Sequence, residues 1–111
     1  MSHPSMIRGA LACVLLGAGL GAAAQTPALF KDADLKLGEK LIVQHKCNQC
    51  HAQKWTADGK AIYRPKGRVN TPALLQGMVE RCSTQLNLSL FPEEVTAMAA
   101  VLNRDHYRFT Q

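Results

Sequence analysis

Cys47, Cys50 and His51 have the residue types and the spacing that most directly indicate chemistry. Two cysteines followed at once by a histidine form the C-x-x-C-H pattern of covalent c-type haem attachment. Thiols one helical turn apart can reach the two vinyl groups on one edge of a porphyrin, and the next side chain then lies under the ring. A neutral imidazole is an ordinary proximal ligand of haem iron. The motif therefore predicts one haem c attached to Cys47 and Cys50, with His51 as the proximal axial iron ligand.

Two other kinds of site use closely spaced cysteines. A C-x-x-C pair can be a redox dithiol, but such a pair normally lies in a βαβ unit, and this sequence predicts none. A zinc site would need a fourth ligand beside Cys47, Cys50 and His51, and three ligands from one turn are cramped. We therefore prefer the haem interpretation.

An apolar N-terminal segment predicts export. Residues 9–20 carry no charge, Arg8 precedes them, and the small residues 22–24 follow. This arrangement is typical of a secretory signal peptide over residues 1–24, cleaved after Ala24 and leading to the periplasm, where c-type haem is attached. The alternative is a membrane anchor, for which the apolar run is too short.

The remaining chain, residues 25–111, is predicted to form a single domain without a membrane span. A chain of 111 residues is too short for a doubly wound nucleotide-binding enzyme, and its aromatic residues are few, with three Phe, two Tyr and one Trp. So small a core usually needs a disulfide, a metal or a cofactor. Cys13 leaves with the signal, and the odd number of cysteines left argues against a disulfide framework.

The pattern along this domain predicts three helices and no secure strand. The helices are expected over residues 34–46, with Asp32 and Asp34 as plausible caps, from Pro72, capped by Thr71, and from Pro92, with Glu93 and Glu94 in the first turn. Their apolar faces are predicted at Gly38, Leu41, Ile42 and His45, at Leu75, Met78, Val79 and Cys82, and at Val95, Met98, Ala99 and Leu102.

Three connecting segments are less regular. Residues 25–31 are expected to be a flexible lead, and residues 103–111 a polar and aromatic tail. Between the first two helices the chain is polar, with a turn at Asp58–Gly59. Trp55 and Ile62–Tyr63 flank this turn, so a small hairpin is an open alternative there.

The chain resembles the small class I c-type cytochromes of bacteria over about residues 35–107. Gly38 lies nine residues before the motif, as a packing glycine does in that family, and residues 92–103 are similar to its C-terminal helix, which crosses the first helix near that glycine. The likeness is specific only at the C-x-x-C-H residues, and the family often has an aromatic residue where this chain has Val101. The resemblance implies an all-α, class I cytochrome c-like fold around one covalent haem.

The sixth iron ligand is open. The resemblance implies a methionine, and Met78 precedes Pro92 by fourteen residues, as the axial Met does in the family. Met78 also fits an apolar helix face, and Met98 is expected to be core. His45 lies on the wrong side of the first helix, and His106 could reach only if the tail folds back. An empty or water-filled sixth position is a further alternative.

Cys82 is expected to be a buried small hydrophobe, with thiolate ligation or a disulfide between two chains as alternatives. The stretch from Met78 to Glu94 is also faintly similar to the small oxygen-binding haem proteins of photosynthetic bacteria, but it lacks their second nearby cysteine.

Basic residues gather around and after the motif, at Lys46, Lys54, Lys60, Arg64, Lys66 and Arg68, with only Asp58 opposing them locally. This cluster is either a solvated loop or a rim that steers an acidic redox protein partner. Arg64, Arg68 or Trp55 could also bind a haem propionate. Because the chain is expected to be exported, nucleic acid is not an expected partner.

These observations predict an electron carrier rather than an enzyme, since no acid–base pair or nucleophile is evident. The alternatives are a haem protein whose open sixth site binds a small ligand, and the haem subunit of a larger periplasmic oxidoreductase. The oligomeric state stays open.

Overall fold

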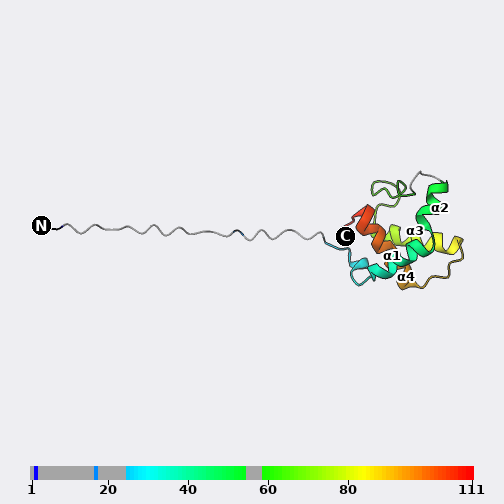
Figure 1. Cartoon of the computed structure of the whole chain (residues 1–111), viewed down its shortest axis with the longest axis horizontal. Helices are drawn as coiled ribbons and strands as arrows, with labels where there is room; N and C mark the ends of the chain where they lie inside the picture. The colour runs from blue at the N-terminus through cyan, green and yellow to red at the C-terminus, as the bar shows by residue number, and fades with distance from the viewer. Residues whose placement is uncertain (1, 3–16, 18–24, 55–58) are drawn as a thin grey trace.

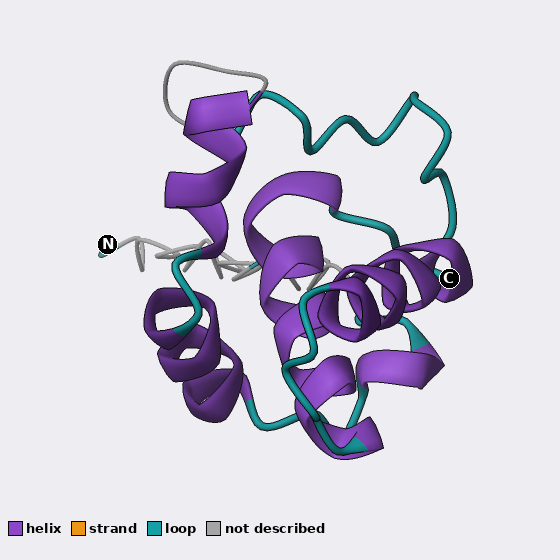
Figure 2. Ribbon diagram, turned by 90° about the vertical axis from the view of Figure 1, so that its right-hand side faces the viewer, coloured by secondary structure: helices purple, strands orange, loops and turns teal. Residues whose placement is uncertain are grey.

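The computed structural model describes residues 25–54 and 59–111, besides positions 2 and 17. All regular secondary structure in this part of the chain is helical. The elements, in chain order, are η1 (Ala28–Phe30), α1 (Leu35–Gln44), α2 (Cys47–Lys54), α3 (Pro72–Gln85), α4 (Pro92–Leu102) and η2 (Asn103–Tyr107) (Figure 1). Figure 2 shows helices joined by loops, without a strand in this part of the chain. The all-α prediction is confirmed, whereas the predicted signal peptide, apart from positions 2 and 17, lies outside the described residues.

Helix α4 is the centre of the fold. It packs most extensively against α1 and also contacts α3, η1 and η2. Its side chains from Ala97 to Leu102 are all buried, as is Val95. Met98, at 4% exposure, is core as predicted. Helix α1 crosses α4 at Gly38, which is buried, so the backbones approach closely there.

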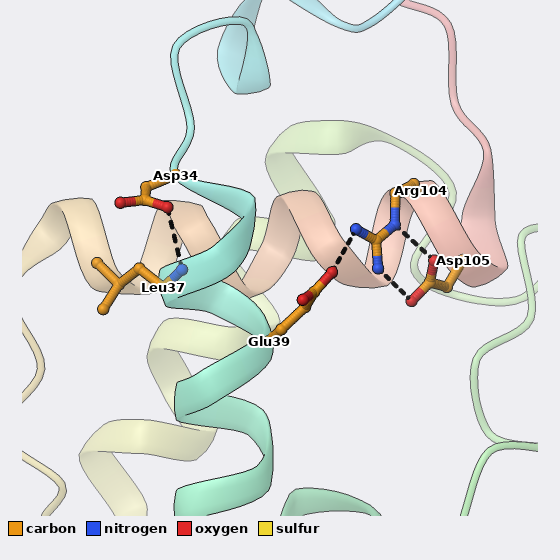
Figure 3. Close-up of polar contacts among 5 residues, drawn as sticks. All are labelled: Asp34, Leu37, Glu39, Arg104 and Asp105. Carbon is orange, nitrogen blue, oxygen red and sulfur yellow. Dashed lines mark hydrogen bonds and ion pairs between the residues drawn. The ribbon is translucent and has the colours of Figure 1, made fainter.

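The predicted helix starts are confirmed. The Asp34 carboxylate accepts a hydrogen bond from the Leu37 amide at 3.0 Å (Figure 3), and Thr71 Oγ1 accepts one from the Leu74 amide at 3.1 Å. At the start of α4 the hydrogen bond runs the other way, from the residue before the helix to a side chain inside it: Glu94 Oε2 accepts from the amide of Phe91 at 2.8 Å. Each bond satisfies a backbone N–H group that the helix itself leaves without a partner.

The N-terminal segment of the domain is packed rather than a loose lead. Pro27 is fully buried, and Phe30 is buried at 3% exposure in the core against α4. The prediction of a flexible lead over residues 25–31 is therefore wrong, because these two apolar side chains have a core face to bury against.

The C-terminal segment also has more structure than the predicted tail. Helix α4 continues into the short π-helix η2, and Tyr107 is buried. The buried Asn103 side chain then fixes the turn, since its Oδ1 accepts from the Phe109 amide at 2.8 Å and its Nδ2 donates to the Phe109 carbonyl at 3.2 Å. Both polar atoms of this buried amide are thus satisfied.

Candidate haem site

The motif begins a helix of its own. Helix α1 ends at Gln44, two residues earlier than predicted, and Lys46 adopts a left-handed conformation with φ 53°. A single residue of this kind ends a helix and redirects the chain, so α2 starts at Cys47 as a separate element. The Lys46 carbonyl accepts the amide of Cys50 at 3.1 Å. Four α-helices are therefore present in the described residues, where the sequence predicts three.

Helix α2 carries the three predicted site residues, with Cys47 in its first turn and the adjacent Cys50 and His51 one turn later. Cys47 and His51 are half-buried, Cys50 is exposed, and both cysteines are free thiols. Burial raises the pKa of the Cys47 thiol; its own backbone amide opposes this shift, and the neighbouring Cys50 and Cys82 add to it. Cys47 is therefore a neutral thiol at neutral pH.

A tyrosine that the sequence analysis does not assign to the site contacts the motif histidine. Tyr63 Oη lies 3.0 Å from His51 Nδ1 and also donates a hydrogen bond to Asn48 Oδ1 at 3.0 Å. Burial, above all, raises the pKa of Tyr63, so its hydroxyl keeps its proton. No spacing rule identifies Tyr63, because twelve residues separate it from His51.

Aromatic side chains hold Tyr63 in place. Its ring centroid lies 4.7 Å from that of His106 and 6.2 Å from that of Tyr107, whose ring packs in turn against Phe109 at 5.3 Å. The C-terminal tail thus folds back toward the motif. This is the arrangement that His106 is expected to need in order to approach the site. His106 reaches the motif through Tyr63, whose ring meets His51 edge-on at 5.6 Å.

Gly59 lets the following loop return onto α2. It is buried with φ 74°, and a Cβ atom there would lie 2.7 Å from the carbonyl carbon of Asn48 and 3.0 Å from the amide nitrogen of Ala52. Only glycine accepts this contact without strain. Residues 59–71 contain turns and no strand, so the hairpin alternative is not observed there, while Trp55 and Asp58 lie outside the described residues.

Helix α3 approaches the motif at Cys82. Cys82 is half-buried and lies close enough to Cys47 and Tyr63 to raise the pKa of both. Burial raises the pKa of Cys82 itself, and Arg81 opposes that shift. Met78, one turn before Cys82, is 41% exposed, so the alternative in which it packs in the core with Leu75 is not observed.

The predicted basic rim is exposed wherever the structure describes its side chains. Lys46, Lys60, Arg64, Lys66 and Arg68 are all exposed, and the side chain of Lys54 lies outside the described residues. Arg64 Nε donates to the carbonyl of Ala61 at 3.2 Å, which ties one of these cations to the loop.

The donor set fits a covalently held haem. Two thiols and one imidazole project from a single short helix, and α3, whose Cys82 approaches Cys47, exposes Met78 and, at 50%, Leu74 as apolar surface. A zinc site would instead need these ligands to converge, and among the described residues no three His, Cys, Asp or Glu side chains do so.

Two cavities lie away from the motif. One of about 300 Å³ lies between α3 and α4, and one of about 450 Å³ lies between the first residues of the domain and its C-terminal segment. The residues that line them do not include Cys47, Cys50 or His51, so neither cavity belongs to the site.

Comparison with family models, with curated proteins and with solved structures finds no match to this chain. Within the described residues, no helix has the length and apolar character that crossing a membrane requires. The functional assignment consequently depends on the residues of the site.

Proposed function

We propose that the chain is an exported, periplasmic monohaem c-type cytochrome with a class I-like fold, which carries single electrons between redox proteins. The observation that carries this proposal is the placement of Cys47, Cys50 and His51 on one short helix, with both thiols free. Residues 1–24 would be the cleaved signal peptide and residues 25–111 the cytochrome domain.

The motif residues would hold the haem in two ways, through the two cysteine thiols and through the histidine. Each thiol would hold the group by adding across one vinyl group, with sulfur bonding to one carbon and the thiol hydrogen passing to the other, so no oxidant is required. His51 would supply the proximal imidazole nitrogen. The bound haem supplies an iron that changes its charge by one electron, while the protein sets the potential through axial ligation and burial.

Met78 is the candidate distal ligand. Its exposure on α3, one turn from a cysteine that approaches the motif, leaves its thioether accessible. If Met78 binds iron, Met78→Ala abolishes the far-red sulfur-to-iron absorption band of the oxidised protein. Leu74→Ala is the matched control, because Leu74 lies one turn earlier on α3 and is also half-exposed.

An open sixth position is the alternative, because Met78 belongs neither to the core cluster nor to the side chains packed against it, so the core does not fix its thioether in one place. The chain would then bind a small ligand, or act as the haem subunit of a larger periplasmic oxidoreductase. Carbon monoxide separates the two functions: a reduced spectrum that does not respond to it supports the electron carrier, and one that shifts supports ligand binding.

The exposed lysines and arginines around the motif support an acidic redox partner. Steering by these charges makes the rate of electron transfer to such a partner fall as ionic strength rises. A rate that is independent of salt would remove the basic rim from the proposal while leaving the haem chemistry in place.

A further inference from the structure

We propose that Tyr63 is a positioning residue that fixes the tautomer and the orientation of His51. The inference deepens the proposed function and rests on it, since it concerns the imidazole that would bind iron. It starts from one observation, that the Tyr63 hydroxyl lies 3.0 Å from both His51 Nδ1 and Asn48 Oδ1.

Counting hydrogens gives the direction of each bond. A tyrosine hydroxyl has one hydrogen, and the amide oxygen of Asn48 can only accept, so this hydrogen goes to Asn48. The Tyr63 oxygen must then accept from His51, which places a hydrogen on Nδ1. A neutral imidazole with its hydrogen on Nδ1 carries its lone pair on Nε2, the tautomer that binds a metal through Nε2.

The surroundings hold this arrangement rigid. Asn48 and His51 lie on the same helix, so the acceptor for Tyr63 keeps a fixed position relative to the imidazole. The Tyr63 ring packs between the motif and the C-terminal turn, against His106 and Tyr107. The close approach of Gly59 to the Asn48 backbone keeps the loop that carries Tyr63 on α2.

This hydrogen bond has a consequence for redox chemistry. An acceptor on Nδ1–H makes an imidazole a stronger electron donor to its metal, which favours the ferric over the ferrous state. Removing the acceptor should therefore raise the reduction potential. Because burial also affects the potential, the hydrogen bond is the cause only if the exchange of the hydrogen on Nδ1 changes together with the potential.

The test expresses the full-length chain with ¹⁵N labelling and uses the processed protein purified from the periplasm. Long-range ¹H–¹⁵N spectra of the His51 side chain, in the reduced state when haem is attached, report which ring nitrogen carries hydrogen and how fast that hydrogen exchanges. Potentiometric titration gives the potential. The variants are Tyr63→Phe, Asn48→Ala and, as control, Tyr107→Phe, which removes a hydroxyl from the same aromatic cluster.

We expect hydrogen on Nδ1 in the unsubstituted chain. Tyr63→Phe should speed its exchange at least tenfold and raise the potential, and Tyr107→Phe should do neither. Asn48→Ala releases the Tyr63 hydrogen, so the hydrogen on Nδ1 should exchange faster there as well. Hydrogen on Nε2 in the unsubstituted chain without haem, or exchange and potential unchanged in Tyr63→Phe, would overturn the inference.

The result is separable from the proposed function. A chain purified without haem removes the proposed function, yet the same spectrum still shows whether Tyr63 fixes the His51 tautomer. If Tyr63→Phe does not fold, the unsubstituted spectrum and Asn48→Ala decide the matter, since neither alters the Tyr63 ring.

Discussion

Gly38 of α1 lies directly against the backbone of Ala97 of α4. A Cβ atom on Gly38 would lie 2.6 Å from the carbonyl carbon of Ala97 and 2.8 Å from Cγ2 of Val101. The obstacle is mainly backbone, which cannot rotate away as a side chain can. The crossing of α1 over α4 therefore requires glycine at this position.

Gly38→Ala should lower the free energy of unfolding by about 1–3 kcal/mol, because an added methyl group overpacks the crossing. The control is Gly77→Ala on α3, where a Cβ atom would meet nothing within 4 Å. Alanine has the higher helix propensity, so this change should stabilise the chain by about 0.5–1 kcal/mol. Urea unfolding measures both. A stabilised Gly38→Ala would contradict the described crossing.

Lys46 adopts an unfavourable left-handed backbone conformation at the junction of α1 and α2, with φ 53°. Lys46→Gly should stabilise the chain by about 1 kcal/mol, because glycine adopts this conformation without a Cβ clash. Lys40→Gly, at an exposed position inside α1, should instead destabilise by about 1 kcal/mol. Thermal unfolding of the two variants gives opposite shifts if the junction is as described.

Asn103 and its neighbour Arg104 should differ sharply in importance. Asn103→Ala leaves the amide and carbonyl of Phe109 without their side-chain partner and should cost about 1–3 kcal/mol. Arg104 pairs with Glu39 and Asp105 on the surface (Figure 3), so Arg104→Ala should cost less than about 1 kcal/mol. Equal losses in chemical unfolding would contradict this distinction.

Before haem attachment, stability should fall at alkaline pH. Burial raises the pKa of Cys47 and Cys82 in the folded chain above the value of 9.0 that an unperturbed thiol has. The unfolded chain then releases these protons first, so the stability is fully present below about pH 9 and is lost as pH rises further.

Urea unfolding of the haem-free chain at pH 7 and pH 10 checks this dependence. Cys82→Ala should weaken it, because one of the two shifted thiols is gone. Cys50→Ala should weaken it less, since Cys50 is exposed and only adds to the shift of Cys47. An alkaline loss of stability that is the same in all three chains would contradict the assignment to buried thiols.

The sequence predicts those features of the fold that depend on local chemistry. Asp34, Thr71 and Pro92 mark helix starts, because caps act within one turn, and the period of α4 identifies Met98 as core. Features that depend on distant partners are not predictable in this way. Phe30 and Tyr107 are buried because they pack in the core with α4. The residues next to them in the sequence do not indicate this contact.

In the candidate site, too, the sequence predicts the residues that depend on local spacing and misses those that depend on distant partners. Cys47, Cys50 and His51 are evident from spacing alone, whereas Tyr63 reaches His51 only because Gly59 and the C-terminal turn bring its loop back. The exposure of Met78 depends on how α3 rotates against α4, which the apolar pattern of α3 does not determine.

The most direct test of the account is the intact mass and absorption spectrum of the chain processed in the periplasm. We predict one haem that withstands denaturation and acid extraction, a sharp reduced c-type spectrum, and loss of the covalent haem in the chain with both Cys47→Ala and Cys50→Ala. Cys82→Ala should keep the haem. A processed chain with no added haem mass would contradict the account.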